Sequence, residues 1–119
     1  MSYNQQLEDR IDHYLIDNEE LYKNKRLGWV GWLLNGNMCF GIYDDLLIIR
    51  LNPSLGSTLV ERAGITNFRQ ADETSGHILA VQPGVYNKGK ALQKFIEYSM
   101  QFTETLPHKE EDEWTTNLQ

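Results

Sequence analysis

The chain has 119 residues, which is enough for one domain with a single hydrophobic core. Its 40% apolar and 24% charged residues are close to the average of globular proteins, so the composition excludes a chain that is disordered throughout. The formal net charge of −6 opposes a surface that follows nucleic-acid phosphates, because such surfaces usually carry a basic patch.

The N-terminal residues and the cysteine content indicate the compartment. The first residues lack the basic start and the apolar core of a signal peptide, and no apolar run approaches the ~20 residues that a membrane helix needs. Cys39 is the only cysteine, so an internal disulfide is impossible and a reducing environment is expected. We therefore expect a soluble cytoplasmic protein without membrane contact.

An amphipathic helix of about four turns is predicted near the N-terminus. Its apolar positions, spaced i, i+4, i+7 and i+8, are Leu7, Ile11, Tyr14 and Leu15. The positions expected on the opposite, solvent-facing side are Glu8, Asp9, Asp12 and Asp17. The apolar stripe should cover an apolar face of a sheet.

The densest basic cluster follows this helix and consists of Lys23, Lys25 and Arg26. One interpretation is a contact with an anion or a nucleic-acid phosphate. The other is a solvated lead-in to the first strand. The cluster has no interleaved aromatic side chains, so the second interpretation is favoured and direct nucleic-acid binding is not expected.

Three consecutive antiparallel strands are predicted between Trp29 and Leu51. Asn35-Gly36 separates two apolar runs and is the strongest short-range hairpin signal, because both residues tolerate a positive φ. A two-residue turn there places Leu33 opposite Met38, Gly31 opposite Phe40 and Trp29 opposite Ile42. A second turn at Asp44-Asp45 places Ile42 opposite Leu47, Phe40 opposite Ile49 and Met38 opposite Leu51.

This register divides the side chains between two faces, because cross-strand partners share a face. The face expected to form the core contains Trp29, Leu33, Met38, Phe40, Ile42, Leu47, Ile49 and Leu51. The other face is mixed, and Trp32, Cys39 and Arg50 are expected to lie in one row across it.

A short helix is predicted after the meander. Asn52 can accept free amide hydrogens at its start, Pro53 suits the first helical position, and Gly64 suits the position that ends a helix. A weak edge strand is expected over residues 67–71 and a stronger strand over residues 77–82.

The last helix is predicted from a regular apolar face formed by Leu92, Phe95, Ile96, Ser99 and Phe102. Asn87 is a candidate cap and Pro107 ends the helix. Residues 1–107 are thus expected to form one domain, and residues 108–119 an acidic mobile tail that contains Trp114 and Leu118.

The predicted architecture is a two-layer α+β fold with a five-stranded antiparallel sheet and helices mainly on one face, in the order α-β-β-β-α-β-β-α. The mixed face then stays partly open. Trp32, Tyr43 and Arg50 are the candidate protein-contact residues, because tryptophan, tyrosine and arginine are typical of interface hot spots and arginine can stack on tryptophan.

No catalytic or metal-binding pattern is found. Cys39 with a histidine could form a nucleophile–base pair, but no motif surrounds it, and a mid-strand cysteine is more often a small buried apolar residue. His13, His77 and His108 have no metal-ligand spacing. We expect no cofactor and no enzyme activity; the alternative is a small-molecule-binding protein or enzyme with a pocket near Cys39.

The run from Arg26 to Pro53 resembles the N-terminal domain of the TfoX (Sxy) competence-regulator family. The resemblance covers roughly residues 5–107 and lies in Gly28 and Gly31, the Asn35-Gly36 turn, Gly41-Ile42-Tyr43 and the apolar strand at 47–51, although the usual Met-Phe-Gly-Gly lead-in is Arg26-Leu27-Gly28-Trp29 here. It implies an α-β(3)-α-β(2)-α fold without enzyme activity.

The best known members of the family act in natural competence, alongside the cyclic-AMP receptor protein at its DNA sites. The helical C-terminal domain of the full-length regulators has no counterpart in this sequence, so a stand-alone domain is expected. The expected function is therefore protein contact, with a protein partner or a second copy in a homodimer, as an accessory in transcription or competence regulation or in a role not yet assigned.

Overall fold

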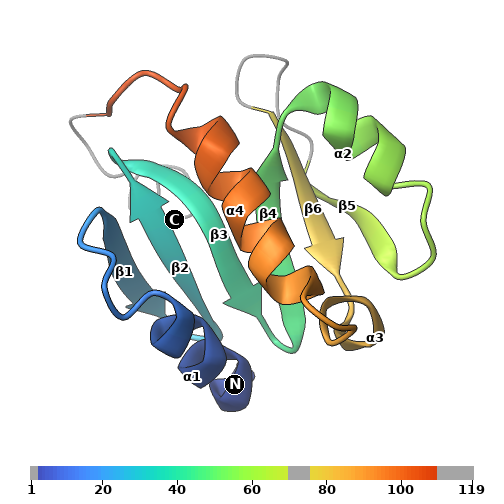
Figure 1. The fold of residues 1–119 in the computed structure, drawn as a ribbon, viewed down its shortest axis with the longest axis horizontal. Coiled ribbons are helices and arrows are strands. Elements are labelled where there is room, and N and C mark those ends of the chain that lie inside the picture. Colours follow the sequence, from blue (N-terminus) through green and yellow to red (C-terminus); the bar gives the residue numbers. More distant parts are fainter. Residues whose placement is uncertain (1–2, 70–75, 110–119) are drawn as a thin grey trace.

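Six antiparallel strands form one sheet in the order β1-β2-β3-β4-β6-β5, and helices cover one of its faces (Figure 1). The computed structural model describes residues 3–69 and 76–109. The strands are β1 (Leu21–Arg26), β2 (Trp29–Leu34), β3 (Asn37–Tyr43), β4 (Leu46–Leu51), β5 (Ile65–Arg69) and β6 (His77–Val81). The helices are α1 (Gln5–Tyr14), α2 (Pro53–Leu59), α3 (Pro83–Tyr86) and α4 (Ala91–Thr103). The predicted α+β class and antiparallel sheet are confirmed.

The predicted number of five strands is wrong, because the segment expected to be a solvated lead-in forms the edge strand β1. It pairs with β2 along its whole length, from Leu21 opposite Leu34 to Arg26 opposite Trp29. Gly28, with φ 88°, takes part in the turn between the two strands. An edge strand has only one neighbour, so it tolerates charged side chains that hide the usual apolar alternation.

The predicted Asn35-Gly36 turn is confirmed, with φ values of 54° and 83°. Next to it, Leu33 pairs with Met38 as expected. The register then shifts by one residue between Trp32 and Leu33.

Beyond that shift Trp32 pairs with Phe40, Gly31 with Gly41 and Trp29 with Tyr43, so the expected Gly31–Phe40 and Trp29–Ile42 pairs are wrong. Cys39 is the extra residue in β3, as in a β-bulge. A pattern of alternating side chains cannot reveal this bulge, because every residue of the strand from Met38 to Tyr43 is apolar or glycine.

Because of the bulge, the side chains of β2 that face the helices are the opposite set from the predicted one. Val30, Trp32 and Leu34 belong to the main core, whereas Trp29 and Leu33 lie on the opposite face of the sheet. The predicted core face is therefore wrong for Trp29, Leu33 and Met38. It is confirmed for Phe40, Ile42, Leu47, Ile49 and Leu51, which are fully buried in the main core.

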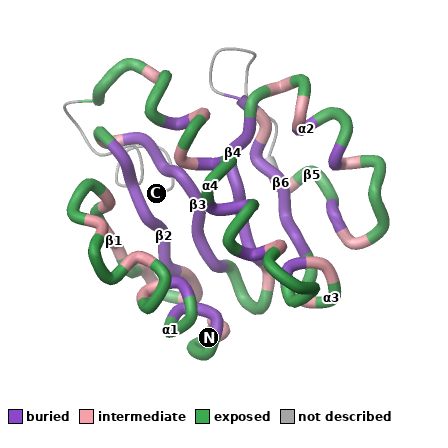
Figure 2. Tube along the Cα trace, viewed as in Figure 1, coloured by how far each residue is buried: buried purple, intermediate pink, exposed green. Residues whose placement is uncertain are grey.

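The second hairpin has the predicted register near its turn, with Ile42 opposite Leu47 and Phe40 opposite Ile49. The expected Met38–Leu51 pair is wrong, because Met38 lies on the opposite face of the sheet from Leu51. All four helices contribute side chains to the main core on the same face of the sheet, and the central strands are buried along most of their length (Figure 2). These side chains are Leu7, Ile11, Leu59, Tyr86, Leu92, Phe95 and Ile96. None of the helices among the described residues is long and apolar enough to cross a membrane.

The predicted start of α2 is confirmed. The Asn52 side chain accepts a hydrogen bond from the Leu55 amide (2.8 Å), and Pro53 is the first helical residue. The helix ends at Leu59, five residues before Gly64, which has φ 86°.

The second half of the chain differs from the prediction in two boundaries. The edge strand β5 begins at Ile65, two residues before the start of the edge strand predicted at 67–71, of which residues 70 and 71 lie outside the described residues. The strand β6 ends at Val81, one residue before the predicted end. The short α3 was not expected, and Asn87 caps its end rather than the start of α4.

Only the first two residues of the predicted tail at 108–119 are described. The Lys109 amide donates a hydrogen bond to the Asn35 carbonyl (2.9 Å), and the Asn37 side chain donates one to the Pro107 carbonyl (2.9 Å). The remaining residues of the tail, including Trp114 and Leu118, lie outside the described residues.

Replacing Gly36 with alanine should destabilise the fold by about 1–2 kcal/mol, because L-residues are strained at positive φ. In addition, a Cβ atom at Gly36 would lie 2.5 Å from the Lys109 carbonyl oxygen. Gly84→Ala is the control, since a Cβ at Gly84 meets no atom within 4 Å. Urea unfolding of both variants measures the effect; equal stability would contradict the role of the turn.

Candidate functional site

The three predicted contact residues do not form one surface. Trp32 is 3% exposed and its ring stacks on Phe40 in the core, with ring centroids 5.1 Å apart. Arg50 is 1% exposed and its Nε donates a hydrogen bond to the Met38 carbonyl (2.7 Å). Tyr43 is 45% exposed at the end of β3.

The predicted row of Trp32, Cys39 and Arg50 is wrong because of the bulge. Trp32 and Cys39 belong to the helix-covered core, whereas Arg50 pairs with Ile78 on the other face. The cation above the Trp32 ring is Lys23, whose Nζ lies 5.7 Å from the ring centroid, and not the expected Arg50.

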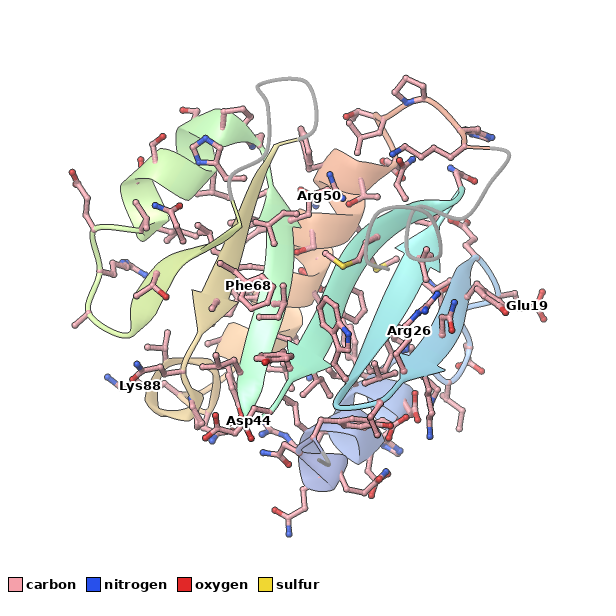
Figure 3. The ribbon with its side chains drawn as sticks, turned by 180° about the vertical axis from the view of Figure 1, so that it is seen from behind. Glu19, Arg26, Asp44, Arg50, Phe68 and Lys88 are labelled. Atoms are coloured by element: carbon pink, nitrogen blue, oxygen red, sulfur yellow. The ribbon has the colours of Figure 1, made fainter. Side chains whose placement is uncertain are left out.

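The face of the sheet opposite the helices, which Figure 3 shows from behind, is here called the helix-free face. It has a buried apolar centre. That centre consists of Leu33, Met38, Ile48, Ile78 and Ala80, each at most 4% exposed. These side chains are not accessible, so a contact surface on this face has to lie nearer its ends.

Three aromatic rings meet at the edge of this centre and are here called the aromatic cluster: Trp29, Tyr43 and Phe68. The ring centroids of Trp29 and Tyr43 are 5.6 Å apart at 82°, those of Trp29 and Phe68 are 6.1 Å apart, and those of Tyr43 and Phe68 are 5.7 Å apart. Phe68 belongs to β5, which β6 and β4 separate from β3, so its side chain reaches across the face (Figure 3). Only tertiary structure brings Phe68 to Tyr43.

The aromatic cluster borders exposed apolar surface. Leu27, in the turn before β2, is 91% exposed. A hollow of about 300 Å³ is lined by Leu27, Gly28, Tyr43 and Asp44. Sequence reasoning identified Tyr43 but missed Trp29 and Phe68, since it placed Trp29 in the core.

The basic cluster contacts a buried carboxylate. Glu8 is 1% exposed, although it was expected on the solvent side of α1. Its carboxylate accepts hydrogen bonds from Lys23 Nζ (2.8 Å), the Tyr3 hydroxyl (2.9 Å) and the Gln5 side chain (2.8 Å), and Lys25 Nζ lies 3.2 Å away. Burial alone would raise the pKa of Glu8, but the hydrogen bonds from Lys23, Tyr3 and Lys25 outweigh it and lower the pKa to about 2.

These contacts favour the structural interpretation of the basic cluster. Lys23 also lies 2.6 Å from an Asp12 carboxylate oxygen, so two carboxylates of α1 are paired with cations of β1. The ion pairs attach the edge strand to the helix. They leave less positive charge available for a phosphate than the sequence alone indicates.

Cys39 is fully buried in the main core. Burial raises the pKa of its thiol to about 12, although the Thr103 hydroxyl and the Arg50 charge act in the opposite direction. The thiol is therefore protonated at neutral pH, which opposes the nucleophilic role considered for it. Within the described parts of the chain, no group of three or more histidine, cysteine, aspartate or glutamate residues could hold a metal ion.

A comparison with protein-family models gave no match, and comparisons with curated proteins and with solved structures gave none either. The similarity to the TfoX N-terminal domain therefore stays a prediction.

Glu8→Gln should remove part of the acid sensitivity of the fold. The folded-state pKa of Glu8 lies below its ordinary value of 4.5, so its contribution is complete above about pH 5 and is lost as pH falls from 4.5 towards 2. With the partners partly exposed, we expect this loss to be about 2 kcal/mol. Urea unfolding between pH 7 and pH 2.5 measures it.

The exposed Glu19 supplies the control for that measurement. Glu19→Gln should keep the full pH dependence of wild type, whereas Glu8→Gln should flatten it and lower stability at pH 7. An unchanged acid slope in Glu8→Gln would show that Glu8 does not stabilise the α1–β1 contact.

Cys39 should react with a thiol reagent such as DTNB at pH 7.5 at least about 100-fold more slowly in the native chain than in denaturant, because the thiol is buried and protonated. The unfolded chain is the internal control. Rapid modification of the native chain would instead support a pocket near Cys39.

Proposed function

We propose that this chain is a non-enzymatic protein-contact domain, similar to the TfoX N-terminal domain, and that its contact surface is centred on the aromatic cluster. The observation that carries the proposal is that Trp29, Tyr43 and Phe68 touch one another on the helix-free face while Tyr43 stays 45% exposed. Large rings supply much of the binding energy of interfaces, and tyrosine and tryptophan are enriched at hot spots.

The surroundings of the cluster suit a contact rather than a catalytic role. The rings of Trp29 and Phe68 pack against the buried centre of the helix-free face, and the Tyr43 ring packs against both of them, so the cluster is ordered before a partner binds. Pre-ordered side chains lose little conformational entropy on binding. A partner that covers Tyr43 would therefore gain buried apolar area at low cost.

Exposed side chains near the cluster enlarge the surface. Tyr22 is 63% exposed and pairs with Leu33, so it shares the helix-free face, and Leu27 is 91% exposed. A stable interface buries about 800 Å² on each partner, more than three rings supply. The proposed surface is thus Tyr22, Leu27, Trp29, Tyr43 and Phe68, with a protein partner or a second copy as its occupant.

The TfoX resemblance supports an accessory role in transcription or competence regulation as the setting for this contact. The alternative, a small-molecule-binding protein or enzyme with a pocket near Cys39, has less support, because that thiol is buried in the core.

Tyr43→Ala combined with Leu27→Ser should weaken the contact at least about tenfold, which corresponds to about 1.4 kcal/mol. Sedimentation equilibrium over a range of concentrations measures contact with a second copy, and quantitative pull-down from the source cell measures contact with another protein. Tyr14→Ala is the matched control, since Tyr14 is 36% exposed and lies on the helix side. If the double variant and the control behave as wild type in both measurements, the proposal is wrong.

A further inference from the structure

We propose that the groove between α2 and α4 binds an acidic segment of a partner protein that carries apolar side chains. This site is separate from the aromatic cluster, because α2 and α4 lie on the other face of the sheet (Figure 1). The inference therefore does not depend on the function proposed above.

The groove has an apolar floor and a basic mouth. Its volume is about 530 Å³. The floor consists of Leu55 and Leu59 from α2 and Ala91, Phe95 and Tyr98 from α4. Tyr98 is 40% exposed, whereas Phe95 and Leu59 are nearly buried and belong to the main core. Apolar side chains of a ligand could pack against this floor, because the core holds Phe95 and Leu59 in place.

Four exposed cations line the same groove: Arg62, Lys88, Lys90 and Lys94. They are four of the eleven basic residues of a chain whose net charge is −6, and no carboxylate is among the residues that line the groove. Within the described residues, the ion pairs of Lys23 and Lys25 involve Glu8 and Asp12, and none involves these four cations. The mouth is therefore a concentrated positive region on an acidic protein, which favours a negatively charged ligand.

The start of α4 adds to this positive potential. Ala91 begins the helix and lines the groove, the first turn carries no acidic residue, and no side chain caps it. Free amide hydrogens and the helix dipole at an N-terminus attract negative charge. This contribution reinforces the four cations and is small beside them.

The groove is elongated, and this indicates a polypeptide rather than a compact anion. A second hollow of about 300 Å³ shares Leu55 and Tyr98 with the first and continues along α4 past Gln101, Phe102 and Thr105. Its lining is uncharged. A segment with acidic residues at one end and apolar residues along its length matches both parts.

A nucleic acid matches the groove less well. A backbone of phosphates needs cations along its whole track, because each phosphate carries a charge. Here the cations gather at one end and the floor is apolar. Recognition of an amphipathic peptide in a groove between helices uses this combination of an apolar floor and a charged rim.

The test is fluorescence anisotropy with the full chain and a labelled peptide of about twelve residues, with glutamates at one end and spaced leucine and phenylalanine residues after them. We expect Lys88→Gln with Lys94→Gln to weaken binding at least about tenfold, and Tyr98→Ala to weaken it several-fold. A peptide with glutamine in place of glutamate should bind the wild-type protein weakly. Its affinity should match that of the glutamate peptide for the Lys88→Gln, Lys94→Gln variant.

Two control variants distinguish an effect of the groove residues on binding from an effect of net charge and from an effect of the aromatic cluster. Gln6→Glu with Gln82→Glu makes the same change in net charge at exposed positions that do not line the groove, and should leave binding within about twofold of wild type. Tyr43→Ala should also bind normally, so failure of one site does not imply failure of the other. Equal binding by the groove variants and wild type would overturn the proposal, as would preference for a labelled single-stranded oligonucleotide over the peptide.

Discussion

The β-bulge at Cys39 determines which side chains this protein buries and which it presents. A strand places alternate residues on opposite faces, so one extra residue reverses the alternation relative to its neighbour. On the turn side of the bulge Met38 faces away from the helices, whereas Phe40, two residues further along the same strand, faces towards them. The stacking of Trp32 on Phe40 in the core, and the presence of Trp29 in the aromatic cluster, both follow from this shift.

The buried carboxylate of Glu8 attaches the basic edge strand β1 to the rest of the fold. β1 contributes few apolar side chains, so hydrophobic burial alone would hold it weakly. Glu8 and Asp12 pair with Lys23 and Lys25 and connect α1 to β1. A buried carboxylate is costly unless it is fully hydrogen-bonded, and Glu8 meets that condition. The same ion pairs neutralise Lys23 and Lys25, which the sequence alone offers as a phosphate-binding cluster.

The two faces of the sheet consequently offer different chemistry. The helix-covered face is closed by the apolar core, and its accessible feature is the groove between α2 and α4, with cations at one end. The helix-free face has a buried centre and an aromatic edge at Tyr43. One surface selects for charge and the other for apolar area, so the two proposals can succeed or fail separately.

Local features were determined by the sequence itself. The Asn35-Gly36 turn, the Asn52 cap and the pairing of Ile42 with Leu47 depend on residues close in the chain, whose preferences act without long-range contacts. Tertiary structure alone decided the bulge, the burial of Glu8, the approach of Phe68 to Tyr43 and the basic groove. All of these except the bulge, which lies within one hairpin, join segments that are separated along the chain. The energies of all four depend on packing and desolvation that no local pattern records.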